Sequence, residues 1–233
     1  MDAVLSVRRE NHDTVTLRLP FAKPFLPGQY VMLGVEADGV ELKRSYSVAN
    51  VFNGEWIELT IRRQDPGLVS KLVQHWSGGE EVRIYGPFGK RFVFDPQSAD
   101  PTTPVILLAA GSGITPFRSF AQAVQKTGYI GTIDLVYSVR APHDVIYSEE
   151  LFTWPVKSTI TLTQPGKDIG AWGGRLGRIS MPLIREIAGA SLARAHYYVC
   201  GPTAFVVDMA GMLRRMGVDP AQIRTEKFGL VEA

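Results

Sequence analysis

The sequence has little cysteine, little histidine and no long apolar segment. Its single cysteine, Cys200, excludes an internal disulfide bond and a cysteine-ligated metal cluster within this chain. The four histidines lack the spacing of metal ligands, so we expect no metal site. No apolar run approaches the ~20 residues of a membrane-spanning helix, and the N-terminus lacks the basic start and apolar core of a signal peptide. We therefore expect a cytoplasmic protein with no membrane partner.

Charge of either sign is also too evenly balanced to indicate a partner. A formal net charge of +2 over 233 residues, without a basic block, argues against a nucleic-acid-binding protein. The length suits one large domain or two domains of ~100 residues each.

Short segments rich in β-forming residues dominate the first part of the chain. Proline and glycine separate them at the close spacing of a small antiparallel β-barrel. We predict strands within residues 3–10, 14–20, 29–35, 42–48 and 56–64.

After about residue 100 the pattern changes to apolar runs that alternate with helical segments. Such alternation is typical of a parallel sheet flanked by helices. We predict strands within residues 105–110, 133–139, 157–164, 195–200 and 223–228, and helices within 116–128, 147–152, 181–190 and 203–217. The predicted fold is therefore a two-domain protein, with a β-barrel over residues 1–99 and an α/β parallel-sheet domain over residues 100–233.

The first strand of the second half runs into a glycine-rich turn. Gly111 permits a tight turn, Gly113 permits close approach of the backbone, and Thr115 is placed to cap the helix that follows. A strand–turn–helix junction of this kind offers backbone amides to a pyrophosphate, which predicts a dinucleotide site. The alternative is a plain turn in which the glycines serve geometry only.

The second strand ends near Ser138, where the ribose of a bound dinucleotide would lie. Sites selective for NAD usually place an acidic residue there, whereas this sequence has Ser138 and Arg140. A guanidinium group beside a hydroxyl suits a 2′-phosphate, which favours NADPH over NADH. The alternative for Arg140 is a solvated loop charge.

Another apolar strand ends in Cys200, Gly201 and Pro202, and Thr203 is placed to cap the helix that follows. The carboxyl edge of an open α/β sheet is where ligands bind, so Cys200 is either a compact neighbour of a reacting carbon or a small core residue. The earlier loop over residues 163–178 is rich in glycine, and its Arg175 and Arg178 are candidates for phosphate contact.

Five short motifs occur together in this chain. They are RSYS at 44–47, GLVS at 67–70, GSGITP at 111–116, CGP at 200–202 and EKF at 226–228. In this order and spacing they resemble the ferredoxin–NADP reductase superfamily, and the resemblance covers essentially the whole chain.

The resemblance implies that the first domain binds a flavin through its strand at 44–47. Arg44 would pair with the flavin's phosphate, Tyr46 would pack against the isoalloxazine and ribityl chain, and Ser47 would hydrogen-bond near N5. Ser45 belongs to the same cofactor-binding motif. The matching turn would bind a pyrophosphate, which favours FAD over FMN. That turn comprises Gly67, Leu68, Val69 and Ser70. The alternatives are a charged edge strand and a simple helix cap.

The same resemblance implies hydride transfer from NAD(P)H to the flavin. Cys200 would line the nicotinamide pocket, and Glu226 would add a polar contact. Phe228 matches the aromatic residue that closes the family's sequence at the flavin face. In plant-type members that residue is terminal, whereas here the segment 229–233 follows it. The tail resembles other branches of the superfamily, so the stacking role of the plant-type terminal residue does not transfer directly to Phe228.

The electrons would then pass to a separate acceptor: a ferredoxin, a flavodoxin-like protein or an oxygenase component. This chain lacks the cysteine spacing of a fused iron–sulfur domain. Six cations could form a basic docking surface or be only solvated surface charges: Lys23, Lys43, Arg62, Arg63, Lys90 and Arg91. Two alternatives remain, a reductase of free flavin and a non-catalytic electron-transfer subunit of a larger complex.

Overall fold

The computed structural model describes residues 1–166, 169 and 172–229, which form two compact units. The first unit comprises Met1–Asp95 and Thr115–Ala123, and the second comprises Pro96–Ile114 and the described part of Val124–Ala233. The domain limits 1–99 and 100–233 stay a prediction. Among the described residues, the helices lack the combination of length and apolar character that crossing a bilayer requires.

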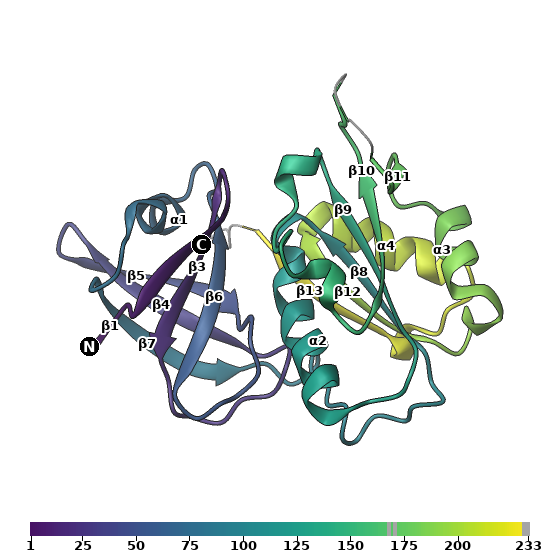
Figure 1. The fold of residues 1–233 in the computed structure, drawn as a ribbon, viewed down its shortest axis with the longest axis horizontal. Helices are drawn as coiled ribbons and strands as arrows, with labels where there is room; N and C mark the ends of the chain where they lie inside the picture. The colour runs from purple at the N-terminus through teal and green to yellow at the C-terminus, as the bar shows by residue number, and fades with distance from the viewer. Residues whose placement is uncertain (167–168, 170–171, 230–233) are drawn as a thin grey trace. The chain divides into compact units, whose positions relative to one another are not determined.

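The first unit consists of two antiparallel sheets (Figure 1), which confirms the predicted fold class for this part of the chain. Its strands are β1 (Asp2–Ala3), β2 (Ser6–Asn11), β3 (Thr14–Pro20), β4 (Tyr30–Ala37), β5 (Val40–Ser47), β6 (Trp56–Arg62) and β7 (Glu81–Phe88). The strand orders are β1-β7-β4-β5 and β2-β3-β6. The short helix α1 (Leu68–Leu72) follows β6 and continues as a 3-10 turn over Val73–His75.

Strand β7 was not among the predicted strands, although its sequence carries a strand signal. Val82 and Ile84 alternate with Arg83 and Tyr85, as residues on opposite faces of a strand do. β7 pairs with both β1 and β4 and so lies inside its sheet.

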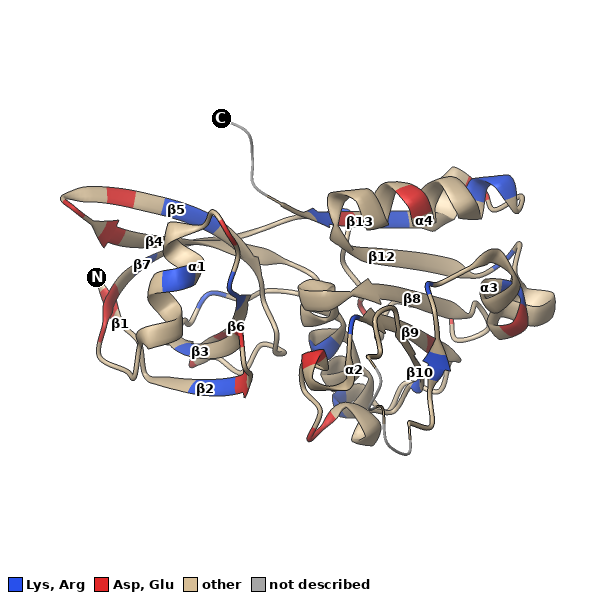
Figure 2. Ribbon diagram, turned by 90° about the horizontal axis from the view of Figure 1, so that it is seen from above, with Lys and Arg blue, Asp and Glu red and all other residues tan. Residues whose placement is uncertain are grey.

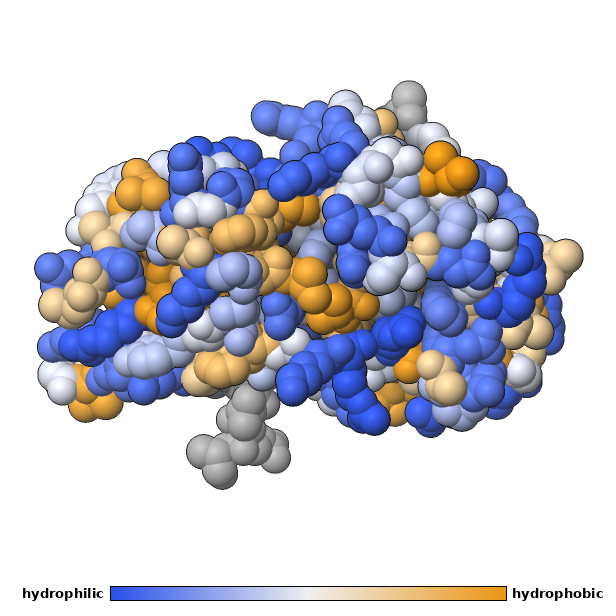
Figure 3. Space-filling view, turned by 90° about the horizontal axis from the view of Figure 1, so that it is seen from below, coloured by the Kyte–Doolittle hydropathy of each residue, from blue (hydrophilic) through white to orange (hydrophobic). Residues whose placement is uncertain are grey.

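The core of the first unit lies between its two sheets. Leu17 of β3 lies opposite Leu59 of β6, and both are fully buried. Each such side chain contributes about 1.5–3 kcal/mol relative to an exposed one. At the surface, apolar residues form small groups among hydrophilic ones on the face drawn in Figure 3.

The second unit is a six-stranded parallel sheet with the order β11-β10-β9-β8-β12-β13. Its strands are β8 (Val105–Ala110), β9 (Ile133–Val139), β10 (Lys157–Leu162), β11 (Arg175–Leu176), β12 (His196–Pro202) and β13 (Ile223–Phe228), and its helices are α2 (Thr115–Thr127, shared with the first unit), α3 (Met181–Ala188) and α4 (Thr203–Arg215). Buried residues of α3 and α4 share one core with β8 and β12, so these two helices cover the same face of the sheet (Figure 1).

One predicted helix is absent from the structure. Residues 147–150 form turns that lead into a 3-10 turn over Leu151–Thr153. Tyr147 adopts a left-handed conformation with φ 62°, its side chain is 2% exposed, and its ring lies 5.9 Å from that of Trp154. Burial of this ring in a conformation that helices do not contain explains why the helical pattern fails here.

Candidate functional site

The order of strands places a topological switch point beside β8. The chain runs from β8 to β9 and β10 on one side, and β12 and β13 lie on the other side. In open parallel sheets, ligands bind at the carboxyl ends of strands where the order reverses in this way. The glycine-rich turn Gly111–Ile114 follows β8 directly and therefore lies at this point.

The backbone at this turn approaches the neighbouring strand closely. A Cβ atom built at Gly113 would overlap the backbone of Cys200, so only glycine fits. Gly111 has φ 53°, which favours glycine as well. The structure thus brings Gly111, Gly113, Cys200 and Gly201 together, and this cradle of backbone fits the phosphates of a dinucleotide.

The start of the following helix differs in detail from the prediction. Ile114 is the N-cap of α2, no side-chain hydrogen bond caps the helix, and Thr115 is its first residue and is buried. Pro116 follows within the first turn as expected. Helix α4 behaves alike, because its N-cap is Pro202 and Thr203 is already helical. The expected capping by these threonines is wrong because both helices begin one residue earlier.

Cys200 lies between two strands of the sheet. Its register partners are Ala109 of β8 and Glu226 of β13, and its side chain is fully buried. Burial, followed by the charge of Glu226, raises the pKa of the Cys200 thiol well above its ordinary value. Phe228 lies half-buried at the end of β13, opposite Pro202, and residues 230–233 lie outside the described residues.

Ser138 and Arg140 lie on the other side of the glycine-rich turn. Ser138 is paired with Ala110 at the end of β8 and is 9% exposed. Arg140 is exposed just after β9, and the hydrogen bond from Gln164 N to its carbonyl (2.8 Å) fixes its backbone. Among the described residues its guanidinium has no carboxylate partner, so it is free to meet an anion.

The candidate phosphate ligands of the glycine-rich loop are placed only in part. Arg175 forms an ion pair with Glu186 and lines a cavity together with Phe152, Trp172 and Ser158. Arg178 is exposed, and residues 167–168 and 170–171 lie outside the described residues. Arg175 is therefore already neutralised by a carboxylate of this chain.

In the first unit, the motif at 44–47 lies on an edge strand. β5 is the last strand in the order β1-β7-β4-β5 of its sheet. Arg44 and Tyr46 alternate with Ser45 and Ser47 along it. Arg44 is exposed, whereas Tyr46 packs against the core and burial raises the pKa of its phenol. A cation beside an aromatic ring on this edge strand fits a ligand that combines phosphate with a ring system, as FAD does.

Ser47 is the last residue of β5 and is 3% exposed. Its register partner is Tyr30 of β4, and Tyr30 in turn is paired with Phe88 of β7. The rings of Tyr30 and Phe88 lie 5.7 Å apart, and Phe88 is 37% exposed. Ser47, Tyr30 and Phe88 thus form a row across three neighbouring strands. The sequence did not indicate this row, because it depends on the register of β7.

The turn at 64–70 is held together by its own serine. Ser70 Oγ accepts a hydrogen bond from Gln64 N (3.1 Å) and donates to Gly67 O (3.0 Å). A Cβ atom at Gly67 would lie 2.6 Å from Ser70 Oγ and 2.8 Å from Gln64 O. Leu68 is exposed and Val69 is buried at the start of α1. Glycine and serine therefore define the shape of this turn together.

The six cations considered for docking divide into two groups. Three form ion pairs: Lys43 with Glu41 (3.2 Å), Arg62 with Asp13 (2.8 Å) and Arg63 with Asp65 (3.5 Å). Lys43 and Glu41 both lie on β5, and Figure 2 shows residues of both charges along this strand. The other three, Lys23, Lys90 and Arg91, are exposed and have no carboxylate partner within the described part of the chain.

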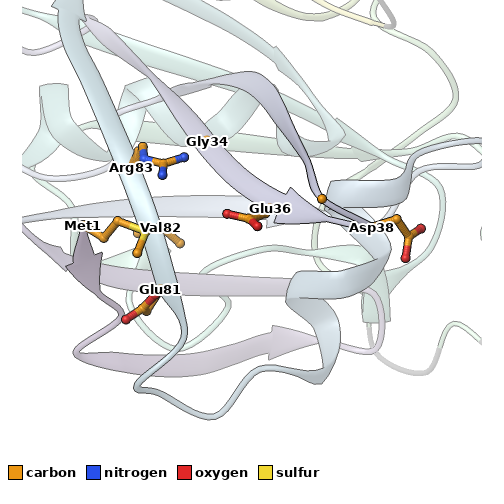
Figure 4. Close-up of a pocket in the computed structure, with 8 residues that line it drawn as sticks. Met1, Gly34, Glu36, Asp38, Glu81, Val82 and Arg83 are labelled. Carbon is orange, nitrogen blue, oxygen red and sulfur yellow. The ribbon is translucent and has the colours of Figure 1, made fainter.

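A separate pocket of the first unit contains none of the predicted site residues. It lies along the β4–β7 pair (Figure 4) and is lined by Met1, Gly34, Glu36, Asp38, Gly39, Glu81, Val82 and Arg83. Arg83 in this pocket pairs with Glu41 at 3.4 Å. Because none of residues 44–47 lines this pocket, it is distinct from the part of β5 that carries Arg44 and Ser47.

Two family models match the two halves of the chain. Residues 3–93 match the oxidoreductase FAD-binding domain, and residues 107–210 match the oxidoreductase NAD-binding domain. The first contains the edge strand β5, and the second contains the glycine-rich turn and Cys200. FAD and a nicotinamide dinucleotide are accordingly the cofactors of this family.

Individual relatives agree with the family models. Ferredoxin–NADP reductase B of Sorangium cellulosum is 31% identical over 215 residues, which covers 88% of this chain and 85% of that protein. The glycine betaine monooxygenase reductase subunit of Pseudomonas aeruginosa is 30% identical, and the chain spans 56% of its length.

Among solved structures, a ferredoxin NADP⁺ reductase from Neisseria gonorrhoeae with bound FAD and NADP has a TM-score of 0.80 at 21% identity and 97% coverage of both chains, which shows a shared fold. Together with the Sorangium relative, these matches show that the chain belongs to the ferredoxin–NADP reductase family.

Proposed function

We propose that this protein is a flavoenzyme that oxidises NAD(P)H and passes the electrons to a separate redox protein. The observation that carries the proposal is the cradle formed by Gly113 and Cys200, because a backbone contact this close admits only glycine in the turn that follows β8, where the phosphates of a dinucleotide would bind. FAD, when bound, would supply an N5 atom that accepts hydride and can release electrons singly.

The residues of the first unit would bind and orient the flavin. Arg44 would bind its phosphate, and Tyr46 would pack beside the ring system. The Ser47 hydroxyl would hydrogen-bond at N5 and support it as it gains a proton. The turn around Gly67 and Ser70 would hold the pyrophosphate through backbone amides, because the Ser70 hydroxyl already maintains the turn.

The residues of the second unit would bind the nicotinamide dinucleotide. Cys200 would stay a neutral thiol, because its burial raises its pKa, and would act as a compact apolar wall. Glu226 would add a polar contact beside it. We infer a preference for NADPH, supported by Arg140, which is exposed and has no carboxylate partner among the described residues.

The electron acceptor would be a ferredoxin, a flavodoxin-like protein or an oxygenase component. The names of the relatives support this proposal, since one is a ferredoxin reductase and another a monooxygenase reductase subunit. Lys23, Lys90 and Arg91 would attract an acidic partner. Their segments are adjacent, because Gln29 Nε2 donates to Gly89 O (2.8 Å) and Phe94 N donates to Pro27 O (3.1 Å). The proposal includes a cytoplasmic location, where NAD(P)H is available.

An anaerobic absorbance titration of the purified protein with NADPH and, separately, with NADH tests the proposal. We expect the bands of a protein-bound flavin to bleach at stoichiometric NADPH. Retention of the yellow colour through dialysis separates this function from the reduction of free flavin. A flavin that stays bound but that neither nucleotide reduces would instead identify a passive electron-transfer subunit.

A further inference from the structure

The segment after Ser47 passes from one sheet of the first unit to the other. Ser47 ends β5, and a bridge between Val48 and Leu59 joins the next residue to β6. Ala49 N donates to Glu58 O at 2.8 Å, and Val48 N donates to Gln29 O at 2.9 Å. The position of Ser47 therefore depends on the path of this crossover segment, residues 48–51.

Two side chains of α2 hold the crossover segment. Arg118 Nη1 donates to Ala49 O at 3.2 Å, and Val51 N donates to Gln122 Oε1 at 3.1 Å. Arg118 and Gln122 are four residues apart and so lie on the same face of the helix. Both belong to the segment Thr115–Ala123, which is part of the first unit.

A buried ion pair fixes Arg118 itself. Its Nη1 lies 2.5 Å from Glu58 Oε2, and the two residues are 5% and 4% exposed. Burial acts to raise the pKa of Glu58, but the charge of Arg118 and the hydrogen bonds of Arg18 and Arg118 hold it below its usual value. Arg18 donates to the other carboxylate oxygen at 2.9 Å, so both oxygens are satisfied.

Glu58 also contacts the crossover segment through its backbone. Its N–H donates to Asn50 Oδ1 at 2.7 Å, and its carbonyl accepts from Ala49 N. Buried ion pairs stabilise a fold little better than apolar residues of the same shape, but they impose a specific geometry. The geometry imposed here is that of the chain directly after Ser47.

We propose that Arg118, held by Glu58, is a positioning residue for hydride transfer. It fixes the crossover segment and through it the hydroxyl of Ser47, while touching neither the flavin nor the nucleotide. The inference rests on the proposed function of Ser47 and adds a requirement that the five motifs do not contain. It assigns a role in the reaction to a guanidinium that is otherwise only part of a buried core.

The test is the rate at which saturating NADPH reduces the bound flavin, measured by anaerobic rapid mixing on the full-length holoprotein. The variants are Arg118→Gln, Glu58→Gln, Arg118→Lys and Gln122→Met. The control is Arg62→Gln, which loses an ion pair to Asp13 from the same strand as Glu58 but leaves the crossover segment untouched. If NADH is the better reductant of the wild type, NADH replaces NADPH throughout.

We expect Arg118→Gln and Glu58→Gln to slow reduction about ten-fold, as small displacements of reacting groups do. The nucleotide concentration for half-maximal rate should not change, and the visible flavin spectrum should shift relative to the control. Arg118→Lys should recover part of the rate, because it keeps the charge. Gln122→Met removes one hydrogen bond and keeps the ion pair, so it should give a smaller decrease.

Rates for Arg118→Gln and Gln122→Met within about two-fold of the Arg62→Gln rate would overturn the inference. If Arg118→Gln fails to fold or loses its flavin, Gln122→Met decides alone by the same criterion. A wild-type flavin that neither nucleotide reduces would refute the proposed function itself, so the two failures are distinguishable.

Discussion

The two units of this protein place their candidate site residues in opposite ways. In the second unit the residues follow the carboxyl ends of neighbouring parallel strands, so that Gly113, Cys200 and Ser138 meet at one edge of the sheet. In the first unit the candidates follow one another along an edge strand, where the positions of Arg44 and Ser47 depend on strand register.

This difference determines what kind of change each site tolerates. The site in the second unit is made largely of backbone, so its shape depends on the space around its glycines. The site in the first unit is made of side chains on one strand, so its shape depends on the hydrogen bonds that fix that strand. Substitutions that add atoms should damage the second unit, whereas substitutions that remove hydrogen bonds should damage the first.

Gly113→Ala should have the largest effect of all. The new methyl group would overlap the backbone of Cys200, which cannot move without disturbing β12, so we expect a loss of about 3 kcal/mol of stability, the upper end of the cost of overpacking. Thermal unfolding would measure the loss of stability, and the affinity for NADPH would measure the damage to the binding site. Gly173→Ala is the matched control, because a Cβ atom there meets nothing within 4 Å. Equal effects of the two substitutions would contradict a backbone cradle at Gly113.

Ser47→Ala should leave FAD bound but slow its reduction about ten-fold, the value of one hydrogen bond of ~1.4 kcal/mol. The side chain is 3% exposed and ends its strand, so the substitution removes a hydroxyl without changing the fold. Single-turnover reduction by NADPH is the measurement. An unchanged rate would show that Ser47 does not act at N5. The contrast between a site of side chains and a site of backbone would then no longer hold.

Arg140→Ala should weaken the binding of NADPH about ten-fold, because it removes a charge-assisted contact of ~1.5 kcal/mol. The affinity for NADH should hardly change, since NADH lacks the 2′-phosphate. Titration calorimetry with both nucleotides would compare the two losses. Equal losses for NADPH and NADH would make Arg140 a general contact and leave the second site as backbone alone.

Much of the fold could be predicted from the sequence, because apolar runs and turn residues follow simple periodicities. The parallel sheet and its glycine-rich turn were predicted in this way, and the family matches confirm the fold class. The helix expected at 147–152 failed because Tyr147 is buried in a left-handed conformation, which only the tertiary structure imposes.

The roles of individual site residues remain predictions, and some neighbours could not have been found at all. The row formed by Ser47, Tyr30 and Phe88 depends on the register of three strands. The pair of Glu58 and Arg118 joins residues that are 60 positions apart in the chain. Periodicity describes only near neighbours in sequence, so contacts of this kind need the structure.

Cys200→Ala should show the smallest effect, a difference in stability from the wild type that changes with pH only under alkaline conditions. Burial raises the pKa of the folded thiol, so only the unfolded chain ionises as pH rises above about 8.5, and the wild type then loses stability. The variant has no thiol to ionise. The difference in free energy of unfolding between the wild type and the variant should therefore narrow by up to ~1.4 kcal/mol per pH unit. Buried tyrosines titrate in both proteins and cancel. Urea unfolding between pH 7 and pH 9.5 would reveal the narrowing, whereas a constant difference would mean that the thiol is open to solvent and not a wall of the second site.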